Sequence, residues 1–476
     1  MKIKIQEMPL SLSRIAEAVG GRLCGKDLCD APSVRYICTD SREADAETLF
    51  CAIIGERVDG HQYISAAMSL GCRAVLCQRQ PAEDVYALVV PDTVTAMGQL
   101  AEAYKHQYLE HLFTVAVTGS VGKTTTKECV AAVLGQGERL FKKDGNYNST
   151  IGLPLSVMEI GHQHTAAVLE MGMSGFGEIS AMSRTVHPDV ACIVNIGSSH
   201  MEHLGSREGI AKAKMEIIEG MKAGSTLLVN GDEPLLYTAR ALCHERNITC
   251  LRVSVTDPQA DFYATDITPL AEGMAFCLHT PKGVLEGVTV PAVGNHMVWA
   301  AAFAAAVGVL RGMSGEAIRQ GLLTYRPAGM RQNITNHRGV TFIEDCYNAA
   351  PESMAAALGV LKLTAKGRMI AVLGDMKELG QDTLRLHRAV GQRVAELACE
   401  GREVHLVTVG ALGAEIAAGA ARDLPADCVF VSRDAAPYED AVRYLKTVLR
   451  EGDTLLFKAS RAMTLEVLAE ALKSND

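Results

Sequence analysis

The chain has 476 residues and a formal net charge of −9, with 46 basic and 55 acidic side chains. Its length suits about three domains, and a composition that is 48% hydrophobic can fill several cores. The acidic balance excludes a general nucleic-acid binder, whose surface would be basic. The 14 cysteines form no C-x-x-C pair and no zinc spacing, so we expect reduced, mostly buried thiols.

The amino-terminal ten residues alternate lysines with apolar residues and lack the apolar core of a secretory signal peptide. The most apolar run, residues 298–310, is too short to cross a bilayer. We therefore expect a cytoplasmic protein without membrane insertion.

The first hundred residues contain one polar loop of interest. A short amphipathic helix is predicted at 12–19, and the segment TDSR at 39–42 precedes a buried strand at 49–53. Arg42 offers a fork of donors that matches phosphate oxygens, and Ser41 adds a hydroxyl, so the loop could hold a phosphate or a uracil edge. The alternative is a solvated turn with a helix-capping serine. Further elements are predicted at 64–70 (helix), 74–77 and 87–90 (strands) and 92–109 (helix, with Asp92 as N-cap).

Residues 113–135 carry the most specific motif, FTVAVTGSVGKTTTKECVAAVLG. Alternating apolar residues predict a buried strand, a glycine-rich turn follows, and Lys123 opens a run with helical periodicity. Backbone N–H groups of such a turn can converge on an anion, Lys123 can reach terminal phosphates, and the Thr124 hydroxyl can bind Mg²⁺. Val117 stands where the usual P-loop spacing has glycine. A strand, turn and helix with chance glycines is the alternative. The expected phosphate contacts are Gly119, Ser120, Val121, Gly122, Lys123, Thr124 and Thr125.

Two polar positions near the next strand could serve the same site. Residues 166–171 form an apolar strand that carries Glu170 near its end, and ligands collect beyond the carboxyl ends of parallel strands. Glu170 is therefore a candidate magnesium ligand, with a solvent-facing glutamate as the alternative. Asn146 and Asn148 lie on a loop before a helix, where they could contact a ligand or stabilise turns.

Past the strand at 190–196, the segment GSSHMEHLG at 197–205 is predicted to be loop rather than helix. His200 could be a neutral ligand or an orienting group beside the nucleotide metal, or a plain loop histidine. In the helix predicted at 207–221, Lys214 shares a face with apolar residues, whereas Lys212 lies on the outer face. An inward lysine either extends past its neighbours to water or is chemically special.

The remainder alternates between sheet and helix signals. Small strands are predicted within 260–290, followed by helices at 294–310 and 314–324. Beyond residue 326, strands and helices alternate as in an α/β unit with a parallel sheet, and acid-rich turns at 344–348 and 374–380 could face the central domain. We therefore predict an α/β protein of three domains. They are a small α/β domain at 1–106, a central P-loop parallel sheet at 107–325 and a Rossmann-like domain at 326–476.

These motifs resemble the Mur ligases, ATP-dependent enzymes that build the peptide stem of bacterial peptidoglycan, and the resemblance covers essentially the whole chain. TGSVGKTTTK at 118–127 is similar to that family's own P-loop. LEMGMSGFGEI, EDCYNAAPESM and KASRAMTLE, which begin at residues 169, 344 and 458, look like segments of the member that adds D-alanyl-D-alanine. TDSR and VDGHQYI resemble the amino-terminal domain that holds uridine diphosphate.

The resemblance implies roles for residues of the central domain. Lys123 would contact the β- and γ-phosphates of ATP, Thr124 and Glu170 would bind one Mg²⁺ ion, and His200 would bind a second. Lys214 would be carbamylated, because a carbamate turns a buried cation into an oxygen ligand for magnesium.

Other implied roles lie in the outer domains, and some positions depart from the family pattern. Arg331 and Asp345 match nucleotide contacts of the third domain. Ser41 and Arg42 would belong to the uridine diphosphate site, and Asn148 would join the substrate site. The family segment G-x-H-N-x-x-N appears as GNHMVWA, so Met297 and Ala300 replace two asparagines, and Cys346 stands where serine is common. The departures leave adenine recognition by that helix open.

The implied reaction joins D-alanyl-D-alanine to UDP-N-acetylmuramoyl-tripeptide. The γ-phosphoryl group of ATP passes to the terminal carboxylate, and the free amine then attacks the acyl phosphate. Two Mg²⁺ ions and Lys123 would neutralise the crowded negative charges. We expect a monomer with no nucleic-acid partner. The alternatives are another amide ligase on this scaffold, such as a folylpolyglutamate synthase, and a nucleotide-binding subunit without turnover.

Overall fold

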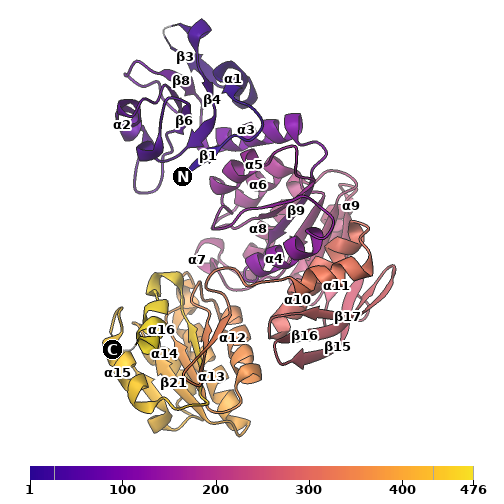
Figure 1. The fold of residues 1–476 in the computed structure, drawn as a ribbon, viewed down its shortest axis with the longest axis vertical. Helices are drawn as coiled ribbons and strands as arrows, with labels where there is room; N and C mark the ends of the chain where they lie inside the picture. The colour runs from indigo at the N-terminus through magenta and orange to yellow at the C-terminus, as the bar shows by residue number, and fades with distance from the viewer. Residues whose placement is uncertain (26, 433, 475–476) are drawn as a thin grey trace.

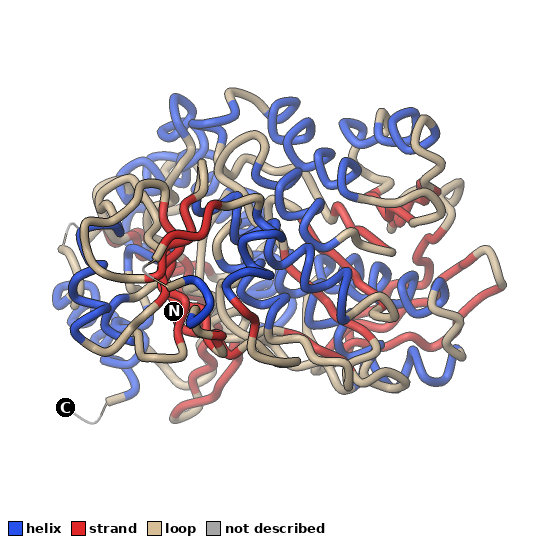
Figure 2. Tube along the Cα trace, turned by 90° about the horizontal axis from the view of Figure 1, so that it is seen from above, coloured by secondary structure: helices blue, strands red, loops and turns tan. Residues whose placement is uncertain are grey.

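The computed structural model describes residues 1–25, 27–432 and 434–474. Three sheets of six or more strands follow one another along the chain, and each is the centre of one unit (Figure 1). We call these the first, central and third units. Seen from above, helices and strands are intermingled across the molecule (Figure 2). The α/β class predicted from the sequence is confirmed.

The first unit is built on a six-stranded sheet with the order β1-β5-β6-β7-β8-β3. Its four inner strands are parallel, and β1 and β3 pair antiparallel at the two edges. Every residue of β6 and β7 is buried, as expected for parallel strands covered on both faces. The strands are β1 (Lys2–Lys4), β3 (Arg22–Cys24), β5 (Tyr36–Cys38), β6 (Thr48–Cys51), β7 (Ala74–Cys77) and β8 (Tyr86–Val89), beside the small pair β2 (Leu10–Ser11) and β4 (Ser33–Val34). The helices are α1 (Leu12–Val19) and α2 (Ile64–Ser69).

The central unit has nine strands in the order β10-β11-β9-β12-β13-β14-β15-β16-β17. The strands from β10 to β15 in this order are parallel, and β16 and β17 continue the sheet antiparallel. Because β9 lies between β11 and β12, the loop after β9 emerges between the carboxyl ends of two neighbours. The strands are β9 (Phe113–Thr118), β10 (Leu140–Lys142), β11 (Ala166–Glu170), β12 (Val190–Ile193), β13 (Thr226–Asn230), β14 (Thr249–Ser254), β15 (Phe262–Leu270), β16 (Gly273–Thr280) and β17 (Gly283–Val290).

Helices cover both faces of the central sheet, because the side chains of β9 enter two different apolar clusters. Val115 and Val117 pack with the alanine-rich helix α10 (Asn295–Leu310), whereas Ala116 belongs to the cluster on the other face. The other helices of the unit are α4 (Lys123–Leu134), α5 (Gly152–Met158), α6 (Glu178–Val186), α7 (Met201–Leu204), α8 (Arg207–Met215), α9 (Ala239–His244) and α11 (Gly315–Leu323).

The third unit has a six-stranded sheet with the order β18-β19-β23-β20-β21-β22. Five strands are parallel, as predicted, and β18 is an antiparallel edge strand that the sequence pattern did not reveal. The strands are β18 (Asn333–His337), β19 (Val340–Glu344), β20 (Met369–Leu373), β21 (Val404–Thr408), β22 (Val429–Val431) and β23 (Thr454–Lys458). The helices are α12 (Pro351–Thr364), α13 (Thr383–Cys399), α14 (Gly413–Ala420), α15 (Glu439–Val448) and α16 (Glu466–Lys473).

Helix α3 (Thr93–Tyr108) joins the first unit to the central unit (Figure 1). It begins as predicted at Asp92, whose side chain accepts a 2.7 Å hydrogen bond from the Thr95 N–H group. The helix packs on α1 of the first unit and on α5 and α6 of the central unit. A boundary at residue 106 therefore falls within its last turn, and we keep the three domain boundaries as a proposal.

Two local expectations need correction. Residues 201–204 form a one-turn helix, α7, rather than loop, and the helix expected to reach residue 221 ends at Met215. A 3₁₀ helix, η4 (Glu216–Gly220), replaces its last turn. The tighter turn lets η4 pack closely on α6, where the Ser183 hydroxyl donates to the Ile217 carbonyl.

The thiols are free, and most are buried as expected, with Cys29 and Cys399 exposed. The buried ones are Cys38, Cys51, Cys72, Cys77, Cys129, Cys192, Cys243 and Cys346. In the described part of the chain, every helix is too short or too polar to cross a bilayer.

Candidate active site

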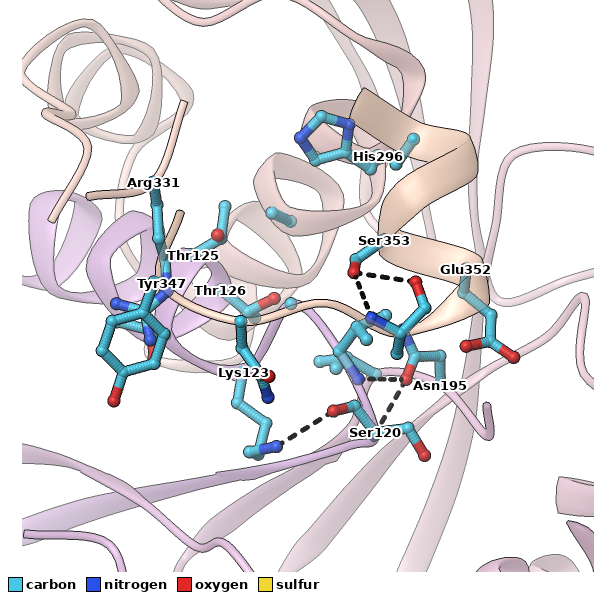
Figure 3. Close-up of a pocket in the computed structure, with 18 of the residues that line it drawn as sticks. Ser120, Lys123, Thr125, Thr126, Asn195, His296, Arg331, Tyr347, Glu352 and Ser353 are labelled. Carbon is cyan, nitrogen blue, oxygen red and sulfur yellow. Dashed lines mark hydrogen bonds between the residues drawn. The ribbon is translucent and has the colours of Figure 1, made fainter. Parts of the chain in front are cut away.

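A cavity of about 730 Å³ lies between the central and third units. The central unit lines it with the loop after β9 and with residues at the ends of β11 and β12, and the third unit with residues after β19 and at the end of β23. Side chains from both units face one another across it (Figure 3). The cavity therefore brings together the carboxyl ends of two sheets.

The loop after β9 has the backbone expected of a phosphate cradle. Gly122 precedes α4 with a φ of 78°, where any other residue would be strained. The N–H groups of Ser120 and Val121 converge on the Asn195 Oδ1 atom, at 2.9 and 3.0 Å. Two converging N–H groups beside a helix N-terminus are suited to an anionic oxygen, and Asn195 marks where such an oxygen could be held.

Lys123 is the cation of this loop. Its Nζ atom donates to the carbonyl oxygens of Gly119 at 2.8 Å and Ser120 at 3.1 Å. Surrounding protein lowers the pKa of Lys123; the charge of Glu170 opposes this shift and that of Arg331 adds to it. Because the side chain still reaches the cavity, an anionic ligand would stabilise its charged form.

Thr124 and Glu170 meet as predicted. The Thr124 hydroxyl donates to Glu170 Oε2 at 2.7 Å, and the Asn148 amide donates to Glu170 Oε1 at 2.9 Å. The structure thus brings Asn148 to the carboxylate rather than to a separate site. A hydroxyl and a carboxylate form the oxygen donor set that Mg²⁺ prefers. Among the described residues, no three histidine, cysteine, aspartate or glutamate side chains cluster as metal ligands.

Lys214 is buried, as its helix register predicted, with 1% of its surface exposed. Burial lowers the pKa of Lys214 well below its ordinary value, and the charge of Lys123 lowers it further. The neighbouring Lys212 is exposed, with its Nζ atom 5.9 Å from the centre of the Phe176 ring. A buried amine close to a second cation is costly unless a negative group accompanies it.

His200 reaches the third unit. Its Nδ1 atom lies 2.7 Å from Glu378 Oε2, without the alignment of a hydrogen bond, and His200 lowers the pKa of Glu378. Both residues have left-handed backbones, with φ of 65° and 63°. Non-glycine residues adopt this conformation at a cost, so the contact is held by its surroundings. The acid-rich turn at 374–380 therefore faces the central unit, as predicted.

The third unit contributes two linked pairs. The Arg331 guanidinium lies 3.7 Å from the centre of the Tyr347 ring, and the Tyr347 hydroxyl donates to the Asn146 side chain of the central unit. Asp345 follows β19, and the buried Lys458 donates to its Oδ2 atom at 2.6 Å. Arg331 and Asp345 both line the cavity, as their predicted role requires.

Ser41 and Arg42 lie in the first unit, apart from the cavity. The Arg42 fork is bound to Asp40, at 2.9 Å and 2.6 Å, and the side chain is 86% exposed. The residue that caps the short helix Ser41–Glu43 is Asp40, not Ser41. A second anion could displace the exposed Arg42 from Asp40.

Comparison with known proteins agrees with this arrangement of three units. Residues 33–105, 117–308 and 330–461 match, in turn, the descriptions "Mur ligase family, catalytic domain", "Mur ligase middle domain" and "Mur ligase, glutamate ligase domain". The UDP-N-acetylmuramoyl-tripeptide--D-alanyl-D-alanine ligase of Bacillus subtilis (strain 168) is 39% identical over 469 residues, which cover 97% of this chain and 98% of the relative. The chain belongs to the Mur ligase family.

Solved Mur ligase structures have the same fold over nearly the whole length. MurF from Acinetobacter baumannii matches with a TM-score of 0.89 and 31% identity, covering 98% of this chain and 100% of the other. MurF from Thermotoga maritima in complex with ADP matches with a TM-score of 0.80 and 28% identity, covering 92% and 96%. This Mur ligase is thus an ATP-dependent, ADP-forming ligase of peptidoglycan precursor synthesis.

Sequence reasoning did not identify several cavity residues of this Mur ligase, and four of them make notable contacts. Asn195 follows β12 at the edge that singled out Glu170, so the same strand-end rule could have found it. Lys458 and Tyr347 belong to segments that carried the family resemblance. Glu352 lies in the same segment as Tyr347 and accepts a 2.8 Å hydrogen bond from the Ser198 hydroxyl across the two units; the resemblance did not single it out.

Proposed function

We propose that this Mur ligase joins D-alanyl-D-alanine to UDP-N-acetylmuramoyl-tripeptide, using ATP and forming an acyl phosphate on the tripeptide carboxylate. One observation carries the proposal: a single cavity holds the phosphate loop, the Thr124–Glu170 pair and the Arg331 and Asp345 side chains of the third unit. The name of the Bacillus subtilis relative, which is matched over nearly its full length, supports this substrate pair.

The chain's own residues can bring a carboxylate and a triphosphate together. The loop N–H groups now bonded to Asn195 would hold phosphate oxygens, and Lys123 would turn from the loop carbonyls to the terminal phosphates. Arg331 and Asp345 would hold the nucleotide from the third unit, and the two closed units would exclude water from the acyl phosphate. Catalysis would then consist mainly of positioning and charge neutralisation.

Two Mg²⁺ ions belong to this proposal. Thr124, Glu170 and Asn148 supply oxygen and amide groups at one point, which supports one site there. His200 would hold the second ion after releasing Glu378. When bound, the ions would offset the charge of the phosphates.

Lys214 would be carbamylated. Its complete burial and its closeness to the positive Lys123 support this, because a carbamate removes the buried cation and adds a negative partner. The neutral amine that burial favours is also the form that can add carbon dioxide.

The remaining roles concern the outer parts of the substrate. Ser41 and Arg42 would bind the uridine diphosphate, and Asn148 would contact the peptide when Glu170 binds metal. We further propose that the enzyme acts in the cytoplasm as a monomer, with domains at 1–106, 107–325 and 326–476.

The decisive experiment measures phosphate release from ATP by the purified full chain. We expect release only when UDP-N-acetylmuramoyl-tripeptide and D-alanyl-D-alanine are both present, with the UDP-linked pentapeptide found by mass spectrometry. Omitting either acceptor, and replacing Lys123 by Ala, are the controls. Turnover with folate and glutamate instead would make the chain a folylpolyglutamate synthase and overturn the proposal.

A further inference from the structure

A carboxylate of the third unit reaches the phosphate loop of the central unit. Glu352 is the second residue of α12 and lines the cavity. An added Cβ atom at Gly197 would lie 2.9 Å from Glu352 Oε2 and 3.1 Å from the Ser120 Cβ atom, so the two side chains meet over this glycine. Figure 3 shows Glu352 close to Ser120 and Asn195. A carboxylate therefore stands beside the loop proposed for phosphates.

The start of α12 fixes the position of Glu352. Pro351 occupies the first helical position, where its missing N–H group costs nothing. The Ser353 hydroxyl accepts from the Ala350 N–H group and donates to the Ala350 carbonyl, each at 3.0 Å. Glu352 Oε1 accepts a 2.8 Å hydrogen bond from the Ser198 hydroxyl of the central unit. The backbone and one carboxylate oxygen are thus held in place.

The second oxygen of this carboxylate, Oε2, is enclosed and receives no hydrogen bond in the described part of the chain. Basic side chains of the cavity contact other groups: Lys123 donates to loop carbonyls, and Lys458 donates to a carboxylate of its own unit. His296 Nε2 lies 3.2 Å from Gln332 Oε1. An enclosed carboxylate oxygen without a donor costs free energy, so Oε2 is suited to a ligand that brings donors and positive charge.

Three other carboxylates of the described chain line the cavity, and each has a different partner. Glu170 accepts from the Thr124 hydroxyl, and Asp345 accepts from a lysine. Glu178 accepts from two backbone N–H groups of its own loop, at 2.7 and 3.2 Å. Among these four carboxylates, Glu352 is the one with an enclosed oxygen that lacks a donor.

The proposed amine substrate supplies the matching group. D-Alanyl-D-alanine carries an ammonium group, which must approach the acyl phosphate at the end of the phosphate loop. The Glu352 side chain is partly exposed and borders the cavity, and the last torsion of a glutamate side chain is broad, so its carboxylate can turn to meet a ligand there. An ammonium group held here would lie beside the phosphate loop.

We propose that Glu352 binds the ammonium group of the amine substrate and takes the first of the two protons that this group loses. The inference rests on the proposed ligation and makes Glu352 a catalytic residue of its second step. The free amine attacks the carbonyl carbon of the acyl phosphate, and the bond from that carbon to the phosphate oxygen breaks. The second proton leaves with the phosphate, as hydrogen phosphate, when the amide forms.

The test compares two nucleophiles on the purified full chain with ATP and UDP-N-acetylmuramoyl-tripeptide. D-Alanyl-D-alanine reacts from an ammonium group, whereas hydroxylamine is uncharged near neutral pH and traps an acyl phosphate as a hydroxamate. Glu352→Gln keeps an oxygen for the Ser198 hydroxyl but removes the negative charge. It should lower kcat/KM for D-alanyl-D-alanine at least about 100-fold and leave the rate of hydroxamate formation within about threefold of the parent.

Glu178→Gln is the matched control, because Glu178 borders the same cavity, and it should change neither rate by more than about threefold. Unchanged kcat/KM for D-alanyl-D-alanine in Glu352→Gln would overturn this inference and leave the proposed ligation standing. Equal loss of both reactions would also contradict it, because Glu352 would then serve the nucleotide or the contact between units. If the unaltered chain formed neither product, the proposed ligation itself would fail, and this inference with it.

Discussion

At the scale of single residues, Lys214 is a buried lysine for which we proposed a chemical role. A buried lysine that serves only packing could be replaced by an apolar chain of similar length at little cost, because the replacement removes the desolvation of the amine. Its side chain is 1% exposed, beside a second lysine. Folding and function should therefore respond differently to the same change.

Replacing Lys214 by Met should leave the free energy of unfolding within about 1 kcal/mol of the parent, because Met fills the same space without a charge. Ligation should fall at least about 100-fold, because an oxygen ligand is lost. Denaturant unfolding and phosphate release measure the two effects, and exposed Lys212→Met is the control. A short carboxylate such as acetate should partly restore Lys214→Ala; full activity of that variant without it would remove the carbamate from the mechanism.

The contributions of the Tyr347 ring and of its hydroxyl can be measured separately, because the two groups contact different partners. Tyr347→Phe keeps the ring against Arg331 and removes the bond to Asn146, so kcat/KM for ATP should fall about fivefold. Tyr347→Leu also removes the cation–π contact and should cost about 30-fold or more. Steady-state kinetics at saturating peptide substrates gives both numbers. Identical losses in the two variants would assign the whole effect to the hydroxyl and contradict a role for the ring.

At the scale of elements, helix α4 is tied to strand β10 by charge as well as by packing. Glu128 of α4 lies 3.0 Å from Lys127 and 2.6 Å from Lys142 at the end of β10. Burial opposes ionisation of Glu128, but the two lysines outweigh it and lower its pKa. The helix that carries Lys123 and Thr124 is therefore held in place by an ionised carboxylate.

The ion pairs of Glu128 with the two lysines predict that the free energy of unfolding depends on pH. A carboxyl whose pKa is lower in the folded chain stabilises it above its unfolded pKa of about 4.3, and the contribution is lost as pH falls toward the folded value. Glu128→Gln should cost about 3 kcal/mol at pH 7, and the difference from the parent should shrink below pH 4. Urea unfolding of both proteins at several pH values is the measurement. The exposed Glu396→Gln should cost under about 0.5 kcal/mol throughout, and a Glu128 effect independent of pH would contradict the ion-pair explanation.

Helices and strands whose apolar residues recur at a regular spacing were predictable from sequence, whereas those defined by tertiary contacts were not. The helix at 12–19 and the strands at 74–77, 340–344 and 369–373 have the predicted bounds, because apolar spacing alone defines their buried faces. Strand β18 carries mostly exposed residues, so its pattern gives no apolar face to detect. The short helix α7 follows His200, which has a left-handed backbone and contacts Glu378 of the third unit, and no local pattern predicts either feature.

At the scale of the whole molecule, the two junctions between units differ. One apolar cluster runs from the first unit through α3 into the central unit, and it includes Ile3, Leu100 and Leu153. Among the residues that the structure describes, the central and third units share no such cluster beyond Met201, and they meet through polar pairs such as Ser198–Glu352 and His200–Glu378. Polar interfaces of this kind separate more readily than continuous cores.

We therefore expect the third unit to move and the first unit to stay fixed to the central unit. Small-angle scattering should show an expanded chain without ligands that becomes more compact with nucleotide and tripeptide substrate. Glu378→Gln should shift the unliganded chain toward the expanded form. If neither the ligands nor the substitution changed the radius of gyration, closure of the third unit would be ruled out.

The site was predictable wherever a local motif carries the chemistry. The phosphate loop, the Thr124–Glu170 pair and the inward direction of Lys214 follow from strand ends and helix register. Other contacts join positions at least 36 residues apart, and only tertiary packing defines them. They are the His200–Glu378 contact, the bond from the Ser120 N–H group to Asn195, and the pairing of His296 with Gln332. Sequence patterns report the face of an element, not the partner that it meets.

The continuous packing of α3 on the first and central units has a consequence for substrate length. If the first unit binds the uridine end of the precursor and the carboxylate must reach the phosphate loop, the distance between these two sites sets the length of substrate that fits. Each amino acid of an extended peptide adds at most about 3.5 Å, so a stem one residue too short could not span the gap by bending the protein. The order in which amino acids are added to the peptide stem would then depend on substrate length as well as on recognition of side chains.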